Sequence, residues 1–311
     1  MSYHEHKVLI LGAAGLDMKV QPRALPVEPG RSNPGRIRCG WGGVARNIAE
    51  NLVRLGAEVH LVTAVGDDEW GHALLEDLKT LGIDTEASIV VPDRSTSSYV
   101  ALYHMDRRLW LAFDDMAIMH EITPGHLDRL RGLIKEVDMI CIDANLSARA
   151  LKTLFRLATR YDVPVCADPT ASLLAYRLHP YLPEITVITP DKDEAEALLG
   201  EPMDSDEAIS NGVRRLVQLG VHLAIITLGV DGLFYATSEE SGRIPASPLE
   251  IVDPVGAGDA LTAAVAYGLL EDVSPEEAVR LGMAAAAQTL LCRETVCPTL
   301  SLESLYDRLT M

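Results

Sequence analysis

Two patterns of hydrophobic positions alternate along the chain. Short runs rich in Val, Ile and Leu predict buried strands, and they span residues 7–12, 58–66, 138–143, 163–168, 186–189 and 223–227. Stretches with apolar residues every three or four positions predict helices, over 44–55, 70–81, 148–161, 191–199 and 205–219. A serine followed by proline and glutamate predicts a further helix over 274–291. This succession is typical of βαβ units, so the sequence predicts an α/β fold with a mainly parallel sheet.

Two segments interrupt this alternation. Residues 97–103 and 109–113 predict a β-hairpin with its turn at Asp106-Arg107, whereas 17–39 is irregular and rich in proline, glycine and arginine. Together they predict a small β lid above the carboxyl edge of the sheet, where ligands bind in open α/β folds. We therefore expect a core of 1–12, 41–95 and 117–311, with 13–40 and 96–116 inserted as lid segments. The exposed edge strand of such a lid invites pairing with a second chain, so we also expect a homodimer formed through the lid.

The charge of the chain narrows the choice of ligands. Its 311 residues include 45 acidic and 27 basic ones, which gives a net charge of −18 and argues against nucleic acid as a partner. An anionic ligand must then be held by local amides, metal ions or a few cations. No apolar run reaches the roughly 18 residues that span a bilayer, and the first seven residues leave no room for a signal peptide. We expect a cytoplasmic protein that does not bind membranes.

The five cysteines show no metal-ligand spacing. Cys141 and Cys166 lie in apolar strand-like runs and are expected in the core, and Cys39 belongs to the irregular segment. Cys292 and Cys297 are close in sequence, but a disulfide between them is not expected in a reducing compartment.

The most informative segment is Asp253-Pro254-Val255-Gly256-Ala257-Gly258-Asp259, which leads directly into a small-residue helix. The unpaired N–H groups at a helix N-terminus and the positive end of its dipole bind anions. Asp259, in the first turn, could take a proton from a hydroxyl while the amides stabilise a transferring phosphoryl group. The alternative is a glycine-rich loop with an acidic residue that only favours the helix dipole.

Polar residues near the first strand are candidates for binding a polyol. Asp17 could accept hydrogen bonds from two sugar hydroxyls, or be a solvated loop residue. Gly42-Gly43 permits close backbone approach at the start of a helix, and Asn47 one turn later can both donate and accept. An ordinary glycine turn with a surface asparagine is the alternative.

Two later segments are candidates for binding a nucleotide and its metal. Asp191 and Glu194 lie on one face of a helix start and could hold Mg²⁺ through water, or only complement the helix dipole. The segment from Thr227 to Gly232 follows a buried strand and could contact a nucleotide or form a simple turn. All of these candidates fall after strands or at helix starts, and in a parallel sheet those positions share one edge.

These motifs give the chain a resemblance to the ribokinase-like (PfkB) carbohydrate kinases over nearly its whole length. The resemblance is carried by Gly42-Gly43-Val44-Ala45-Arg46-Asn47 and by the 253–260 segment. It implies a three-layer α/β/α sandwich with a small β-sheet lid, and ATP- and Mg²⁺-dependent phosphorylation of a sugar or nucleoside. It further implies that Asp259 is the catalytic base.

The other site residues follow from the same resemblance. Gly256, Ala257 and Gly258 form the anion hole, and the sugar is bound by Asp17, Gly42, Gly43 and Asn47. ATP contacts are implied for Asp191, Thr227, Gly229, Gly232 and Gly258. Mg²⁺ is held through water by Glu194 and Asp191, and a monovalent cation, K⁺, by Asp253.

Within the family, four segments are similar to those of pseudouridine kinases. They span 32–37, 96–99, 114–118 and 143–147. The similarity implies transfer of phosphate to the 5′-hydroxyl of pseudouridine, with Asn33, Ser98 and Asn145 among the substrate contacts. The alternatives are a kinase for another nucleoside or sugar, such as uridine, adenosine, ribose or fructose, and a ligand sensor without turnover. Two departures from the family pattern are Asp191, where Asn is usual, and Pro254, where Thr is frequent.

Overall fold

The computed structural model describes residues 6–106 and 108–310, and in this part of the chain the core is an eight-stranded sheet. Its strand order is β14-β13-β12-β11-β10-β9-β1-β4. The strands are β1 (Lys7–Leu11), β4 (Glu58–Val62), β9 (Met139–Asp143), β10 (Val165–Asp168), β11 (Val187–Ile188), β12 (Leu223–Thr227), β13 (Leu233–Ala236) and β14 (Ser241–Ile244). The six strands from β4 to β12 are parallel, and β13 and β14 are added antiparallel at one edge.

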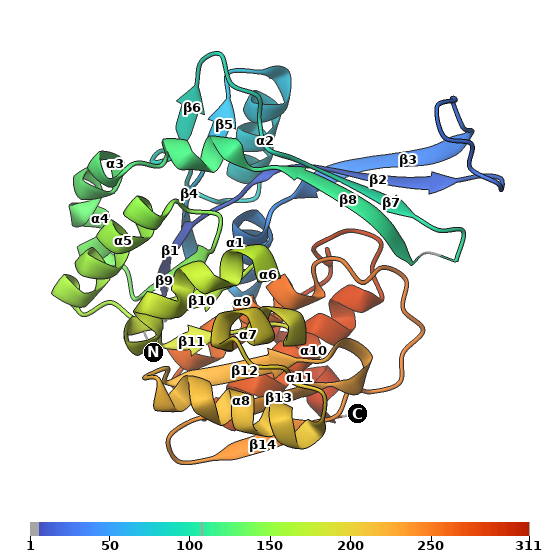
Figure 1. The fold of residues 1–311 in the computed structure, drawn as a ribbon. Helices are drawn as coiled ribbons and strands as arrows, with labels where there is room; N and C mark the ends of the chain where they lie inside the picture. The colour runs from blue at the N-terminus through green and yellow to red at the C-terminus, as the bar shows by residue number, and fades with distance from the viewer. Residues whose placement is uncertain (1–5, 107, 311) are drawn as a thin grey trace.

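Helices cover both faces of this sheet (Figure 1). One face carries α3 (Pro124–Arg129), α4 (Arg131–Glu136), α5 (Ala148–Tyr161), α6 (Ser172–Ala175), α7 (Lys192–Leu199) and α8 (Asp206–Gln218). The other carries α1 (Val44–Leu55), α2 (Glu69–Thr80), α9 (Ala257–Leu270), α10 (Pro275–Leu290) and α11 (Leu302–Thr310). Short 3₁₀ turns are η1 (Ala117–Glu121), η2 (Tyr176–Glu184) and η3 (Gly229–Asp231). Successive residues of β1 are buried against opposite helix layers, which explains why the strand is apolar throughout.

A second sheet of four strands forms the lid, in the order β3-β2-β7-β8. Its strands are β2 (Gly15–Pro22), β3 (Gly35–Gly42), β7 (Ser98–Tyr103) and β8 (Leu109–Asp115), and it extends sideways beyond the core (Figure 1). A small two-stranded sheet pairs β5 (Ala64–Gly66) with β6 (Ile89–Val91). The structure therefore has the predicted α/β/α layers with a separate small sheet, and we keep the exact lid boundaries, 13–40 and 96–116, as a proposal.

Most of the predicted elements are present, and their ends follow from local capping. Helix α1 ends at Gly56, which adopts a left-handed conformation, and α10 begins after Ser274, whose side chain accepts from Glu277 N. Three expectations are corrected. The irregular segment 17–39 contains most of a regular antiparallel hairpin, β2–β3; the 58–66 strand divides into β4 and β5, which join different sheets; and β13–β14 were not predicted. Of the predicted turn at Asp106-Arg107, Arg107 lies outside the described residues.

None of the described helices combines the length and the apolar character needed to cross a bilayer.

Candidate active site

The N-terminus of α9 offers free amide groups at the carboxyl edge of the sheet. Gly256 is its N-cap residue, with a φ of 90°, and no side chain caps this end of the helix. A side chain at Gly256 would collide with the Thr295 carbonyl oxygen, since an added Cβ would lie 1.9 Å from it. Around Gly258, by contrast, the space for a Cβ is open. The first N–H groups of α9 are thus available to an anionic group.

Asp259 lies in the first turn of α9 and meets Asn47 from α1. Asn47 Nδ2 donates to Asp259 Oδ2 at 2.7 Å, although the two residues are 212 positions apart. Burial raises the pKa of Asp259 to about 7, and the hydrogen bond from Asn47 opposes that rise. A carboxylate with this pKa can accept a proton near neutral pH, which a general base must do.

Asp17, on strand β2 of the lid, borders the same part of the site as Asn47 and Asp259. It is buried and lies against the backbone of Gly42, where an added Cβ would fall 2.1 Å from the Asp17 carboxyl group. Burial raises the pKa of Asp17 to about 6, while the positive charges of Lys19 and Arg46 act in the opposite direction. The structure therefore brings the predicted Asp17, Gly42, Asn47 and Asp259 together, beside a cavity of about 610 Å³ that Asp17 lines.

Arg46 was not predicted as a site residue, and it fixes the orientation of Asn47. The Arg46 side chain is buried, its Nη2 pairs with Glu50, and its Nη1 donates to Asn47 Oδ1 at 3.1 Å. Because the amide oxygen faces Arg46, the amide nitrogen must face Asp259. The sequence signal was an arginine directly before the asparagine in an otherwise apolar helix start, which is an unusual place for a charge.

Asp191 and Glu194 form a reciprocal capping box at the start of α7. Each carboxylate accepts a hydrogen bond at 2.8 Å from the backbone N–H of the other residue. Burial, followed by the charges of Asp191 and Asp259, raises the pKa of Glu194 to about 7. The predicted carboxylate pair is therefore part of the helix cap, and Glu194 is also close enough to Asp259 for the two charges to interact.

A further carboxylate, Asp168, ends β10 between these groups and was not predicted as a site residue. Burial raises its pKa well above the usual value, and the nearby charges of Glu194 and Asp259 add to the effect. It accepts hydrogen bonds from Thr170 N and Thr262 Oγ1. An aspartate at the carboxyl end of a parallel strand was the available signal. The charges of Glu194 and Asp259 oppose ionisation of Asp168, but among the described residues no three His, Cys, Asp or Glu side chains lie close enough together to hold a metal ion directly, so a Mg²⁺ held through water stays a proposal.

A separate cavity of about 580 Å³ lies at the start of α7 and the end of β12. Three of the predicted nucleotide contacts line it, namely Asp191, Thr227 and Gly229. Thr227 N also donates to Pro190 O at 3.0 Å, which joins the two segments. Gly232 does not line this cavity; its position is packed against the carbonyl oxygen of Ile244.

Of the remaining predicted substrate contacts, Asn33 and Ser98 lie apart from this group, whereas Asn145 lies at the same edge of the sheet. Asn33 is exposed at the tip of the β2–β3 hairpin, and among the described residues its amide bonds to the backbone of Glu28 and Arg31. Ser98 pairs with Leu16, on the opposite face of the lid from Asp17. Asn145 follows β9 and is buried, with its N–H donated to Asp143 Oδ1 at 2.9 Å.

Asp143 was not predicted as a site residue, and it fixes the turn that follows β1. Its Oδ2 accepts from Ala13 N at 2.7 Å and from Ala45 N at 3.3 Å. It therefore ties the end of β1 to the start of α1, which carries Asn47.

Asp253, the predicted K⁺ ligand, already has a cation beside it. Lys19 Nζ donates to Asp253 Oδ2 at 2.7 Å, and Val255 N donates to Oδ1 at 3.1 Å. Both side chains of the ion pair are largely buried. Each carboxylate oxygen can accept more than one bond, so these contacts leave the predicted K⁺ role of Asp253 untested, while the Lys19 ammonium already supplies a positive charge beside it.

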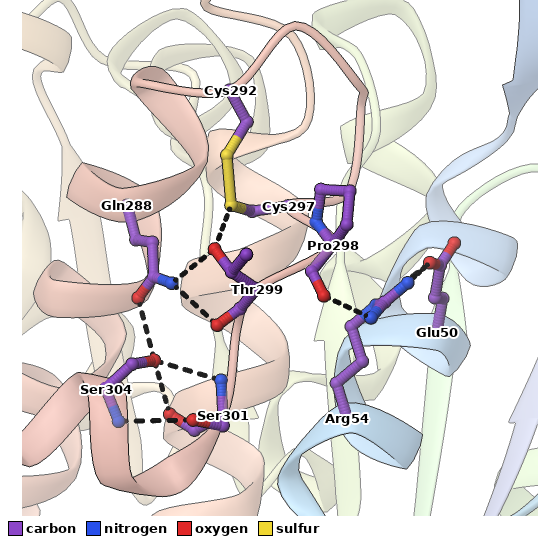
Figure 2. The surroundings of a disulfide bond; sticks show 9 residues. All are labelled: Glu50, Arg54, Gln288, Cys292, Cys297, Pro298, Thr299, Ser301 and Ser304. Atoms are coloured by element: carbon purple, nitrogen blue, oxygen red, sulfur yellow. Dashed lines mark hydrogen bonds and ion pairs between the residues drawn. A yellow bond between two sulfur atoms is a disulfide. The ribbon is translucent and has the colours of Figure 1, made fainter.

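The expectation about Cys292 and Cys297 is wrong, since the structure joins them in a disulfide (Figure 2). The loop after α10 turns back on itself and brings their Cα atoms to 5.5 Å, a distance typical of a disulfide. The same loop is also fixed by Gln288 Nε2, which donates to Thr299 O at 3.0 Å, and by Arg54 Nη1, which donates to Pro298 O at 2.7 Å (Figure 2). Cys141 and Cys166 are buried free thiols, as predicted.

Comparison with known proteins agrees with this geometry. The sequence profile described as pfkB family carbohydrate kinase matches residues 5–300. The uncharacterized sugar kinase YeiI of Escherichia coli is 32% identical over 281 residues, which cover 90% of this chain and 77% of the relative. Pseudouridine kinase of the same organism is 31% identical over 301 residues, covering 96% of this chain and 95% of the relative. Ribokinase of Arabidopsis thaliana, solved with ribose and ATP, has a TM-score of 0.86 over 99% of this chain and 100% of that one, at 22% identity.

Proposed function

Because the chain belongs to the pfkB family of carbohydrate kinases, we propose that it transfers the γ-phosphate of ATP to the 5′-hydroxyl of pseudouridine. Kinase activity on a sugar or nucleoside follows from the family, and the choice of pseudouridine is the proposal. The observation that carries the catalytic assignment is the Asp259 carboxylate, held by Asn47 at the uncapped N-terminus of α9.

Asp259 acts as the general base. Its pKa of about 7 leaves a substantial deprotonated fraction at neutral pH, and the Asn47 amide holds the carboxylate toward the acceptor site. As the hydroxyl oxygen attacks the γ-phosphorus, its proton passes to Asp259. The amides of Ala257 and Gly258 then donate to the negative charge that develops on the transferring group.

Asp17 binds and orients the acceptor. A carboxylate has two oxygens that accept hydrogen bonds, so it can bind the two neighbouring hydroxyls of a ribose ring. Its position against Gly42, with Asn47 on the following helix, leaves the ring between the lid and α1. The accepting hydroxyl would then face Asp259.

The donor nucleotide is assigned to the cavity beside Asp191, Thr227 and Gly229. The carboxylates that line this cavity outnumber its two cations, Lys192 and Arg243, so ATP would enter with its charge compensated by Mg²⁺. Glu194 and Asp191 would hold that ion through water. When bound, Mg²⁺ would neutralise part of the charge of the phosphates.

The acceptor assignment is supported by a relative named pseudouridine kinase over almost the full length of both chains. Asn33, Ser98 and Asn145 remain proposed base contacts, and of these only Asn145 lies at the carboxyl edge of the central sheet. A second candidate is a sugar acceptor, because a relative that is 32% identical is described as a sugar kinase. A sensor without turnover is the remaining alternative.

We also propose that the outer face of the lid forms a homodimer. Ile37, Leu111 and Phe113 are strongly exposed, and strand register places them on one face, opposite Asp17. Exposed apolar side chains gathered on one sheet face indicate an interface.

The test measures ADP release from ATP in the presence of Mg²⁺, with pseudouridine, uridine, adenosine, ribose or fructose as the acceptor. We expect kcat/KM for pseudouridine to exceed that for each of the other four acceptors by at least about tenfold. Preference for another acceptor would overturn the substrate assignment and leave the kinase. Acceptor binding without ADP release from any of the five would identify a sensor.

A further inference from the structure

The disulfide between Cys292 and Cys297 closes a short segment between α10 and α11 (Figure 2). We call residues 292–297 the disulfide loop. The two cysteines are only five positions apart, so the cross-link fixes the shape of this segment and little else of the chain. Its importance therefore depends on what the disulfide loop touches.

The disulfide loop packs against the glycine loop that leads into α9. The carbonyl oxygen of Thr295 lies so close to Gly256 that an added Cβ there would be 1.9 Å from it. Directly before the disulfide loop, Leu290 O accepts from Val252 N at 2.8 Å and from Asp253 N at 3.4 Å. The backbone that presents the free amides of α9 is thus supported by the chain that the disulfide constrains.

The same segment also forms part of the acceptor site. Five of its residues line the cavity of about 610 Å³ that Asp17 lines, namely Arg293, Glu294, Thr295, Val296 and Pro298. Pro298 O accepts from Arg54 Nη1 at 2.7 Å, and Arg54 belongs to α1, which also carries Asn47 (Figure 2). One short cross-linked segment therefore touches the glycine loop, the acceptor cavity and the helix that orients the base.

The two sulfur atoms differ in their access to solvent. Cys292 is half-buried and precedes the exposed Arg293, whereas Cys297 is completely buried. A thiolate from solution would therefore attack Cys292 Sγ, and Cys297 would be the leaving thiolate. Thr299 Oγ1 lies 3.5 Å from Cys297 Sγ, and its hydroxyl can donate to that thiolate. Stabilisation of the leaving thiolate makes the exchange faster.

We propose that the Cys292–Cys297 disulfide is a thiol–disulfide exchange site for a dithiol reductant, and that its reduction slows the kinase. One thiolate of the dithiol attacks Cys292 Sγ, the S–S bond breaks, and Cys297 leaves as a thiolate that takes up a proton. The second thiol of the reductant then displaces Cys292. The protein gains two electrons and two protons, and the dithiol becomes a disulfide.

Slower turnover follows from the contacts of the disulfide loop. Without the cross-link, the Thr295 backbone is no longer fixed against Gly256, so the amides at the start of α9 lose their fixed positions. Donors stabilise a transition state most when they are already in place before the reaction. The effect on turnover rests on the proposed function, whereas the exchange and the loosening of the glycine loop can be measured without turnover.

The first arm of the test follows the exchange itself. Alkylation of the denatured protein should find three thiols before treatment with dithiothreitol and five afterwards, because three of the five cysteines are already free. In reduced wild type, the backbone amides of residues 252–258 should exchange hydrogen at least about tenfold faster than in the oxidised protein, and those of the buried strand β9 should be unchanged.

Single variants test the difference in access. In a Cys39→Ser background, which removes the exposed free thiol, Cys297→Ser leaves Cys292 unpaired and Cys292→Ser leaves Cys297 unpaired. The thiol of Cys292 should react with dithionitrobenzoate at least about tenfold faster than that of Cys297, because thiol reactivity requires access. Equal rates would overturn the assignment of Cys292 as the attacked sulfur.

The second arm measures turnover of the acceptor that gives the highest rate. We expect kcat/KM of reduced wild type to be at least about fivefold lower than that of the oxidised protein, and to recover when glutathione disulfide restores the cross-link. Cys292→Ser/Cys297→Ser should match reduced wild type and ignore dithiothreitol. Cys39→Ser is the control and should keep the response of wild type.

The comparison of oxidised with reduced wild type needs no substitution, so it remains decisive if the double variant does not fold. An unchanged kcat/KM, with the thiol count raised from three to five, would show a purely structural disulfide and overturn the proposal. A response that persists in the double variant would also overturn it. Absent turnover in both redox forms would refute the proposed function instead, and the hydrogen-exchange comparison then decides whether reduction frees the glycine loop.

Discussion

Replacing Asp259 by asparagine should abolish catalysis and at the same time stabilise the fold. Asparagine keeps the shape of the side chain and can still accept a hydrogen bond from Asn47, but it cannot take a proton. Loss of a general base typically lowers turnover by roughly 10²–10⁴-fold. Acceptor binding should change little, because the proton is transferred only in the transition state.

The size of the stabilisation follows from the pKa. The folded protein raises the pKa of Asp259 from 3.8 to about 7, so between these values the folded state binds more protons than the unfolded state. The stability linked to this group is therefore fully present below pH 3.8 and is lost as pH rises through 7. About three pKa units correspond to about 4 kcal/mol. A neutral asparagine side chain at this position should avoid this loss of folding free energy, so Tm at pH 8 should rise by roughly 5–10 °C.

The assay pairs ADP release with thermal unfolding of wild type and Asp259→Asn at pH 5 and pH 8. We expect an inactive variant whose advantage in Tm over wild type is larger at pH 8 than at pH 5. Turnover within tenfold of wild type would refute the role of Asp259 as base. A variant less stable than wild type at pH 8 would refute the burial of a costly charge at this position.

Three further predictions concern the metal, the cation and the lid. Glu194→Gln should keep the α7 capping box, since glutamine serves there as well as glutamate. The variant should nevertheless turn over at least tenfold more slowly and need more Mg²⁺ for half-maximal rate, and an unchanged Mg²⁺ titration would show that Glu194 is not part of the metal site. Exchange of K⁺ for choline should alter wild-type turnover less than about twofold, because Lys19 already neutralises Asp253. Lys19→Met should turn over more slowly, and its rate should rise when K⁺ is added, whereas strong K⁺ dependence of wild type would contradict this reasoning. Phe113→Glu should convert the proposed dimer to a monomer, as measured by light scattering at micromolar concentration, whereas the control Leu173→Glu, on an exposed helix, should stay dimeric. A monomeric wild type would rule out the interface.

The sequence was informative wherever the determinants were local. The helix ends at Gly56 and Ser274 follow from capping preferences. The glycine loop before Asp259 could be recognised as a candidate site because free amides and a carboxylate are adjacent in the chain. The carboxyl-edge rule for parallel sheets was enough to bring Asp17 and Asn47 to the same place as Asp259.

The parts that could not be predicted depend on contacts between distant segments. The β2–β3 hairpin is an exception. Residues 16–21 and 36–39 do alternate between apolar and polar side chains, but the proline- and glycine-rich connection between them made the whole segment look irregular. Lys19 reaches Asp253 across 234 positions, and no spacing rule connects them. The disulfide was rejected from an assumption about the compartment, whereas the folding of its loop decides the distance between Cys292 and Cys297.

The most direct test of the central claim is ³¹P NMR of the products formed from ATP, Mg²⁺ and pseudouridine. The account predicts a phosphomonoester resonance that grows together with ADP, is coupled to the 5′ protons of the nucleoside, and is absent with Asp259→Asn. Phosphate that appears only as the inorganic ion, or an ester formed equally well by the variant, would contradict it.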